Sequence, residues 1–230
     1  MRTLFFIFST LIISLNLNSQ NISEDYLGSW YSYSSSHRIN ERFSVNPYAE
    51  LRLYEASSNY NLAYVSIGGT YHMKNKQSLG FGYAYVDIDT VFEFDDEPNV
   101  HEHRLFQQYS KSHKLGAFNV SHRSRLEQRF LEFNSGWELQ NRFRYRIQFN
   151  YQINKTFSLV LSEEPFINFQ DQVFHENRFY AGIGLNVMKN SRIQLGYMKQ
   201  HIRKNNLNRL IIGVSITTDT RKISQPIAHL

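Results

Sequence analysis

Residues 141–151 read NRFRYRIQFNY, and from Arg142 to Tyr151 two kinds of side chain alternate. An aromatic and aliphatic set alternates with an arginine and amide set: Phe143, Tyr145, Ile147, Phe149 and Tyr151 against Arg142, Arg144, Arg146, Gln148 and Asn150. On a helix these residues would mix arginine with phenylalanine on every side, whereas a strand sends successive side chains to opposite faces. The stretch therefore predicts a β-strand with one apolar face and one charged face.

The same division recurs in other parts of the chain, which indicates a repeated architecture. Near the start, an apolar set alternates with a polar one: Phe43, Val45, Ala49, Leu51 and Leu53 against Arg42, Ser44, Asn46, Glu50 and Arg52. Residues 178–186 and 192–197 repeat the pattern with arginine on the polar face, and in residues 63–71 and 79–85 the second face is small. We therefore expect an all-β fold whose strands each separate two environments.

Three observations favour a membrane-spanning barrel over a water-soluble sandwich or soluble barrel, which are the alternatives. Several strands have about nine or more residues, which suits a tilted strand that crosses a bilayer better than the usual five or six. Tyr and Phe gather toward the ends of the apolar faces, as in the aromatic girdles of outer-membrane proteins. An export signal without any cysteine also fits this location. The sequence thus predicts an antiparallel transmembrane β-barrel of about 10–12 strands.

The strand number follows from the turns. Our tally is about eleven strands between Tyr26 and Thr218. Single-chain bacterial barrels normally have an even number of strands, so ten and twelve are both open. Tyr26–Ser34 is the doubtful strand. Short basic turns are expected on the periplasmic side, at residues 74–76, 111–114, 154–155 and 189–192. They interleave with the connections 87–99, 133–140, 165–176 and the short 203–206 on the other side.

The N-terminus has the pattern of a secretory signal. Arg2 precedes an apolar stretch from Leu4 to Leu15, and a small residue, Ser19, offers a cleavage site. The apolar stretch is shorter than the roughly 20 residues that a spanning helix needs. We expect a cleaved signal peptide at residues 1–19, an outer-membrane barrel at residues 20–218 and a C-terminal tail at residues 219–230.

Composition excludes several classes of function. The chain has no cysteine, so a disulfide framework, a thiolate metal site, a cysteine nucleophile and a lipidated cysteine are all ruled out. The net charge is +5, yet the basic residues recur singly inside strands and form no block, which argues against a nucleic-acid partner. No glycine-rich phosphate loop or dinucleotide motif is present.

Charged side chains on the polar faces must point into an enclosed lumen, because each would cost roughly 2–4 kcal/mol at the lipid-facing midplane. The predicted lumen charge ladder contains Glu50, Arg52, Glu102, Arg104, Arg123, Arg125, Glu127, Arg129, Arg142, Arg144, Arg146, Glu164, Arg178 and Arg192, with Arg209 added by the same alternation. The planar guanidinium fork of arginine suits such a ladder, since it can bind a carboxylate through two bonds.

A lipid-modifying enzyme is the minority hypothesis. His122 and Ser124 lie two residues apart on the outward face, in an arrangement similar to the His-x-Ser pair of outer-membrane phospholipases. That family adds an asparagine on the neighbouring strand, where we expect Ile147 and Phe149 instead, and the pair is expected at mid-strand. Without an orienting residue the nucleophile is incomplete, so no catalytic residue is assigned.

A metal site is a further candidate. His101, Glu102 and His103 stand beside the acidic loop 87–99, whose carboxylates could attract a cation. The spacing matches no specific ligand motif, and an acidic run is more often a solvated loop. We therefore expect neither a metal nor any other cofactor.

The chain also resembles a known family. Trp30, the stretch HRSRLEQR at residues 122–129, the run RFRYR at residues 142–146 and EPF at residues 164–166 are similar to an uncharacterised family of bacterial outer-membrane proteins, the domain of unknown function DUF2490. Asn177 and Arg178 belong to the same resemblance, which covers nearly the whole mature chain. The resemblance implies a barrel and supplies no activity, ligand or catalytic residue.

Together these patterns favour a non-enzymatic outer-membrane barrel with an arginine-rich lumen. In so narrow a barrel the ladder would fill the interior, whereas an open lumen would be a porin-like pore that prefers anions. A phospholipase-like enzyme using His122 and Ser124, and a structural or partner-binding barrel acting through its long loops, remain as alternatives. The expected partners are outer-membrane lipid and small anions, and no protein partner is indicated.

Overall fold

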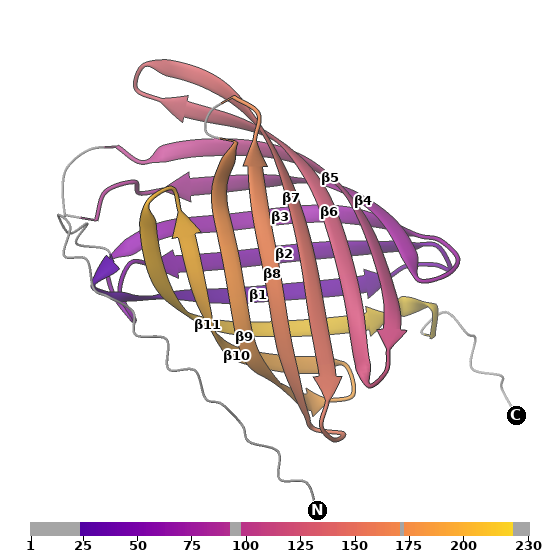
Figure 1. The fold of residues 1–230 in the computed structure, drawn as a ribbon. Coiled ribbons are helices and arrows are strands. Elements are labelled where there is room, and N and C mark those ends of the chain that lie inside the picture. Colours follow the sequence, from indigo (N-terminus) through magenta and orange to yellow (C-terminus); the bar gives the residue numbers. More distant parts are fainter. Residues whose placement is uncertain (1–23, 93–97, 171–172, 223–230) are drawn as a thin grey trace, which may run out of the picture.

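The structure, a computed structural model, describes residues 24–92, 98–170 and 173–222 as an all-β fold (Figure 1). The predicted signal peptide, residues 1–19, lies outside the described residues, as do residues 223–230 of the predicted tail. The described part of the chain contains no helix long and apolar enough to span a membrane.

Eleven strands and one short 3-10 helix make up the described fold. In chain order they are β1 (Leu27–Arg38), β2 (Phe43–Leu53), β3 (Tyr60–His72), β4 (Gln77–Ile88), β5 (Val100–Leu115), β6 (Phe118–Phe133), β7 (Gly136–Gln152), β8 (Phe157–Asn168), β9 (Phe174–Met188), β10 (Ser191–Ile202), β11 (Asn205–Asp219) and η2 (Thr220–Lys222). The predicted barrel of about 10–12 strands is confirmed, and so is the tally of eleven. Of the stretch Tyr26–Ser34, all but Tyr26 belongs to β1.

The strands close into a barrel in which each strand pairs with its neighbours in sequence (Figure 1). All of these consecutive pairs are antiparallel, but β1 and β11 pair in parallel from Leu27–Asn208 to Arg38–Asp219. The expectation of an even strand number is therefore wrong. With an odd number of up-and-down strands the first and last run in the same direction, so only a parallel ladder can close the barrel.

Alternation of side chains produces the two surfaces of this barrel. On the outer face, Ile67 of β3 and Phe81 of β4 are 56% and 69% exposed, whereas the inward-pointing Ala84 and Val86 of β4 are fully buried. Gly82, also inward, leaves room for the ring of Phe106, whose Cζ would lie only 2.4 Å from an added Cβ. The interior is thus filled by side chains from facing walls, as expected for a small barrel.

Two predicted turns lie largely in strands, and the predicted connection 165–176 overlaps the ends of β8 and β9. Residues 133–140 were expected as a long connection, but β6 and β7 continue to a tight turn between Phe133 and Gly136, whose φ of +120° favours glycine. This hairpin projects beyond the neighbouring strands (Figure 1). Residues 111–114 were expected as a turn and belong to β5 instead, because the chain reverses two residues later at Gly116, with φ of +56°. Lysine content alone does not mark a turn when a strand end is solvated.

An engineered disulfide should test the parallel ladder between β1 and β11, which we call the parallel seam. The chain has no cysteine of its own. Tyr33 and Val214 are Cα partners across β1 and β11, and both are exposed. The double variant Tyr33→Cys/Val214→Cys should cross-link on oxidation and change mobility on a non-reducing gel. In the control Tyr33→Cys/Leu210→Cys the second cysteine lies about 13 Å further along the strand, beyond disulfide reach. Preferential cross-linking of the control pair would contradict this register.

Candidate functional site

The structure places the predicted charged residues on the inward face of the wall, where most line the lumen or are buried beneath it. They come from β2, β5, β6, β7, β8, β9 and β10: Glu50, Arg52, Glu102, Arg104, Arg123, Arg125, Glu127, Arg129, Arg142, Arg144, Arg146, Glu164, Arg178 and Arg192. Arg209 of β11 and Glu176 of β9 lie among them, and Glu176 was missed from the sequence although it alternates with Arg178.

Glu127 is at the centre of this cluster. Its side chain is inaccessible to solvent and accepts hydrogen bonds from Arg142 at 2.6 Å and Arg144 at 2.9 Å. Arg104 and Arg125 add ion pairs at 3.6 and 3.9 Å. Four guanidinium groups from three strands thus surround one carboxylate, which a buried negative charge requires if it is to remain ionised.

Two further carboxylates extend the cluster into a continuous chain of alternating charges. Glu102, also fully buried, pairs with Arg104 at 2.6 Å and with Arg129 at 2.7 Å. Glu164 pairs with Arg123 at 2.6 Å and with Arg144 at 3.0 Å. Because Arg104 and Arg144 each bridge two carboxylates, the ion-pair chain runs in the order Arg129, Glu102, Arg104, Glu127, Arg144, Glu164 and Arg123.

Aromatic rings pack between these guanidinium groups. Phe166 is fully buried, and the guanidinium carbons of Arg142, Arg144 and Arg178 lie 5.1, 4.6 and 4.5 Å from its centroid. The guanidinium carbon of Arg178 also lies 4.8 Å from the ring centroid of Trp30. The π faces attract these cations, so the interior tolerates more arginines than carboxylates. Phe166 was not predicted as a lumen residue, although it stands two positions after Glu164 and so shares its face.

Two further ion pairs lie beside the ion-pair chain. Arg52 pairs with Glu50 at 2.6 Å, and Arg178 pairs with Glu176 at 2.5 Å. Arg52 also lies 3.7 Å from the ring centroid of Trp30, which Arg178 contacts as well, so the tryptophan joins both pairs. The ion-pair chain, these two pairs and the rings of Trp30 and Phe166 thus form one layer of charges and rings inside the barrel.

Two cavities of about 420 Å³ each border this layer. The first cavity lies toward the β3–β4 and β7–β8 turns, and Thr70 and Gln148 are among its lining residues. The second cavity lies toward the β4–β5 connection, and Asn61 and Thr90 are among its lining residues. The side chains that line both are Trp30, Arg52, Tyr64, Arg104, Arg144 and Arg178. These six side chains are the common wall of the two cavities, which we call the turn-side and loop-side cavities.

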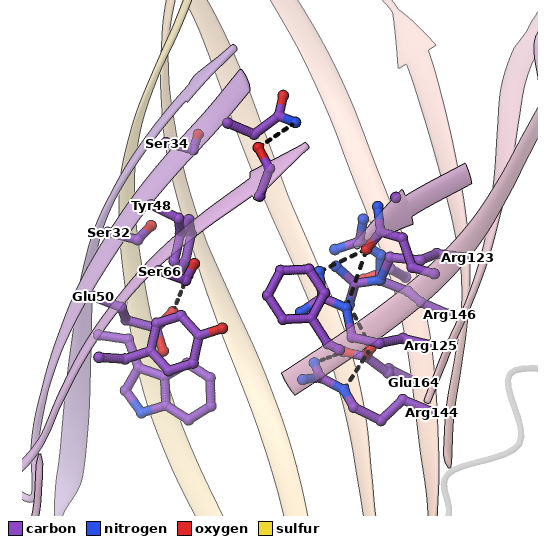
Figure 2. Close-up of a pocket in the computed structure, with 18 of the residues that line it drawn as sticks. Ser32, Ser34, Tyr48, Glu50, Ser66, Arg123, Arg125, Arg144, Arg146 and Glu164 are labelled. Carbon is purple, nitrogen blue, oxygen red and sulfur yellow. Dashed lines mark hydrogen bonds and ion pairs between the residues drawn. The ribbon is translucent and has the colours of Figure 1, made fainter. Parts of the chain in front are cut away.

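Three of the interior arginines form no ion pair with a carboxylate in the part of the chain that the structure describes. Arg192 donates to the hydroxyl of Ser158 at 2.7 Å, and Arg209, 2% exposed, donates to the carbonyl of Tyr54 at 3.4 Å. Arg146 lines the turn-side cavity and makes no hydrogen bond, ion pair or ring contact with any other described residue. Figure 2 shows it beside Arg123, at the edge of the ion-pair chain.

His122 and Ser124 lie on the outer face of β6, at the fifth and seventh of its 16 residues. The Nδ1 atom of His122 is 2.7 Å from the hydroxyl of Tyr145, and its ring stacks on His113 with centroids 5.2 Å apart. Ile147 is opposite His122 as expected, but Tyr145, not Phe149, is opposite Ser124. Within the described ranges no carboxylate or amide orients the histidine, so the geometry does not complete a nucleophile.

The side chains considered as metal ligands do not point toward a common site. His101 and His103 point outward from β5, whereas Glu102 between them points into the lumen. His101 is 3.0 Å from the carboxylate of Asp87. Among the described residues, no group of three or more His, Cys, Asp or Glu side chains could hold a metal ion. Residues 93–97 of the acidic loop lie outside the described part of the chain.

Comparison with known proteins gives a family. Residues 27–211 match the family described as Protein of unknown function (DUF2490), so the match runs from the start of β1 into β11 and includes the whole ion-pair chain. No curated protein and no solved structure matches the chain. Because the family match covers most of the sequence, the chain belongs to the DUF2490 family.

Proposed function

We propose that this protein is an exported outer-membrane β-barrel without enzymatic activity, whose lumen is closed at mid-height by the ion-pair chain. The observation that carries the proposal is the contrast between the two faces of the wall. Buried, paired charges fill the inside, while large apolar side chains are exposed around the outside. A soluble barrel would have the reverse distribution or a mixed outer surface.

The outer face supports a lipid environment in detail. Exposed apolar side chains occur on most strands, among them Val65, Ile67, Phe81, Leu105, Leu126, Leu161, Phe179, Ile183, Leu195 and Val214. Aromatic pairs lie toward the strand ends, as with Phe43 and Tyr71, whose centroids are 5.1 Å apart, and Phe118 and Tyr151 at 5.5 Å. An apolar band between aromatic girdles is the surface that a bilayer requires.

A charge placed on this outer face should distinguish a membrane barrel from a soluble one. Ile67→Arg, near the middle of β3, should lower the free energy of folding into lipid vesicles by about 2–4 kcal/mol, because the guanidinium must enter hydrocarbon. The measurement is urea-dependent unfolding in vesicles. Ser57→Arg, in the exposed β2–β3 connection, is the matched control and should change the value little. If both variants fold equally well, and do so without lipid, the membrane assignment fails.

The ion-pair chain should be the main electrostatic contribution to stability. Glu127→Gln keeps the shape of the side chain but leaves four guanidinium groups without their shared charge, so we expect a loss of about 3–5 kcal/mol in the free energy of unfolding. The same unfolding measurement checks this value. Glu132→Gln, an exposed residue on the projecting hairpin, removes the same charge without a buried partner and should be nearly neutral. Equal effects of the two variants would refute a structural role for Glu127.

A pore is the second candidate, and the arginine excess around both cavities favours it. The turn-side cavity is lined by seven arginines and two glutamates, and the loop-side cavity by seven arginines and one glutamate. Any path that joined them would favour anions. In this proposal the shared layer keeps that path closed.

Planar-bilayer recording separates the closed barrel from the pore. The wild-type protein should show no stable unitary conductance, because the shared layer blocks the lumen. Trp30→Ala removes a ring that lines both cavities and should produce small, anion-biased openings. A stable conductance of the wild-type protein would reject the closed layer and establish the pore in its place.

A further inference from the structure

The turn-side cavity contains a block of four arginines that the ion-pair chain neutralises only in part. The register places Arg123 beside Arg146 and Arg125 beside Arg144 on β6 and β7. Like charges directly opposite one another on neighbouring strands repel. A fold that keeps these four arginines together needs negative charge beside them, supplied by groups outside the block.

The protein supplies only part of that charge. Glu164 binds two members of the block, Arg123 and Arg144. Arg125 donates to the amide oxygen of Gln108, at 2.6 and 3.1 Å, and its guanidinium is 3.9 Å from Glu127. Arg146 makes no hydrogen bond or ion pair with a described residue, although the carboxylate of Glu164 attracts it electrostatically. Two guanidinium groups therefore reach the cavity with donor capacity left over.

Structural packing does not account for Arg146. Other arginines of the layer are held over aromatic rings, such as Arg125, 4.3 Å from the centroid of Phe106. Arg146 lies over no ring in the described structure and faces the cavity instead. A side chain that merely braced the barrel would be expected to contact the groups it braces.

The opposite wall of the same cavity is rich in hydroxyl groups. Ser32 and Ser34 of β1, Tyr48 of β2 and Ser66 of β3 face the arginine block across the lumen (Figure 2). The carboxylate on that side, Glu50, is already bound by Tyr48 and Arg52. The cavity thus has one cationic wall and one largely neutral wall of hydrogen-bonding groups.

We infer that the turn-side cavity binds a small hydroxylated oxyanion of the sugar-phosphate class, with the phosphate against Arg146 and Arg125 and the hydroxyls toward Ser32, Ser34 and Ser66. The two walls match these two parts of one molecule. The volume of about 420 Å³ is within the usual range of small-molecule sites. Guanidinium forks bind phosphate through paired, charge-assisted hydrogen bonds. The inference rests on the barrel interior and not on membrane insertion or conductance.

Calorimetric titration of the folded, detergent-solubilised protein at constant ionic strength tests the site. Glucose 6-phosphate should bind, inorganic phosphate should bind more weakly because it leaves the hydroxyl wall unused, and glucose should not bind. Arg146→Gln should weaken glucose 6-phosphate binding by about tenfold or more, since a hydrogen-bonded charge is lost. Arg146→Lys should restore part of the affinity. Lys189→Gln, in the exposed β9–β10 turn, is the matched control and should bind as the wild type does.

Each alternative result has a defined meaning. Failure of the wild-type protein to bind either phosphate compound overturns the inference, and so does an Arg146→Gln variant that binds as tightly as the wild type. Equal affinity for phosphate and glucose 6-phosphate rejects the role of the hydroxyl wall. Because Arg146 makes no hydrogen bond, ion pair or ring contact within the described structure, the variants should keep the unfolding midpoint of the wild type. Binding without membrane insertion would reject the proposed function and leave this site in place.

Discussion

The structure depends on the burial of one negative charge among four positive ones. Glu127 has no contact with solvent, and Arg104, Arg125, Arg142 and Arg144 reach it from three neighbouring strands. A charge so placed cannot be solvated by water, so the strands that carry its partners must keep their register. Alternation along the strands places these side chains together on the inward face.

Much of this arrangement can be predicted from period-two alternation alone. The sequence of residues 141–151 separates arginine from phenylalanine on a strand, and the structure keeps that separation in β7. The partners within the lumen cannot be predicted in the same way, because they depend on which residues of neighbouring strands are opposite one another. Trp30 and Phe166 show a second limit: rings packed against guanidinium groups belong inside, although aromatic residues were expected mainly on the lipid side.

Turn positions and strand number were less predictable. The hairpin of β6 and β7 continues through polar residues that suggested a loop, since paired strands beyond the barrel rim can be solvated on both faces. Whether the number of strands is odd or even has no local signal in the sequence, because it depends on how the last strand pairs with the first. The acidic stretch at residues 87–99 is only partly described, and the function of its carboxylates does not follow from the sequence.

The parallel seam affects how the chain can fold. Hairpins form between strands that are adjacent in sequence, but His37 and Thr218, whose side chains are bonded across the seam at 2.7 Å, are 181 positions apart. The entropy cost of closing so long a loop is met only after the intervening hairpins have assembled. Until then β1 and β11 are both unpaired sheet edges, ready to join another chain. Intermolecular pairing at these two edges is thus the main hazard of assembly for this barrel.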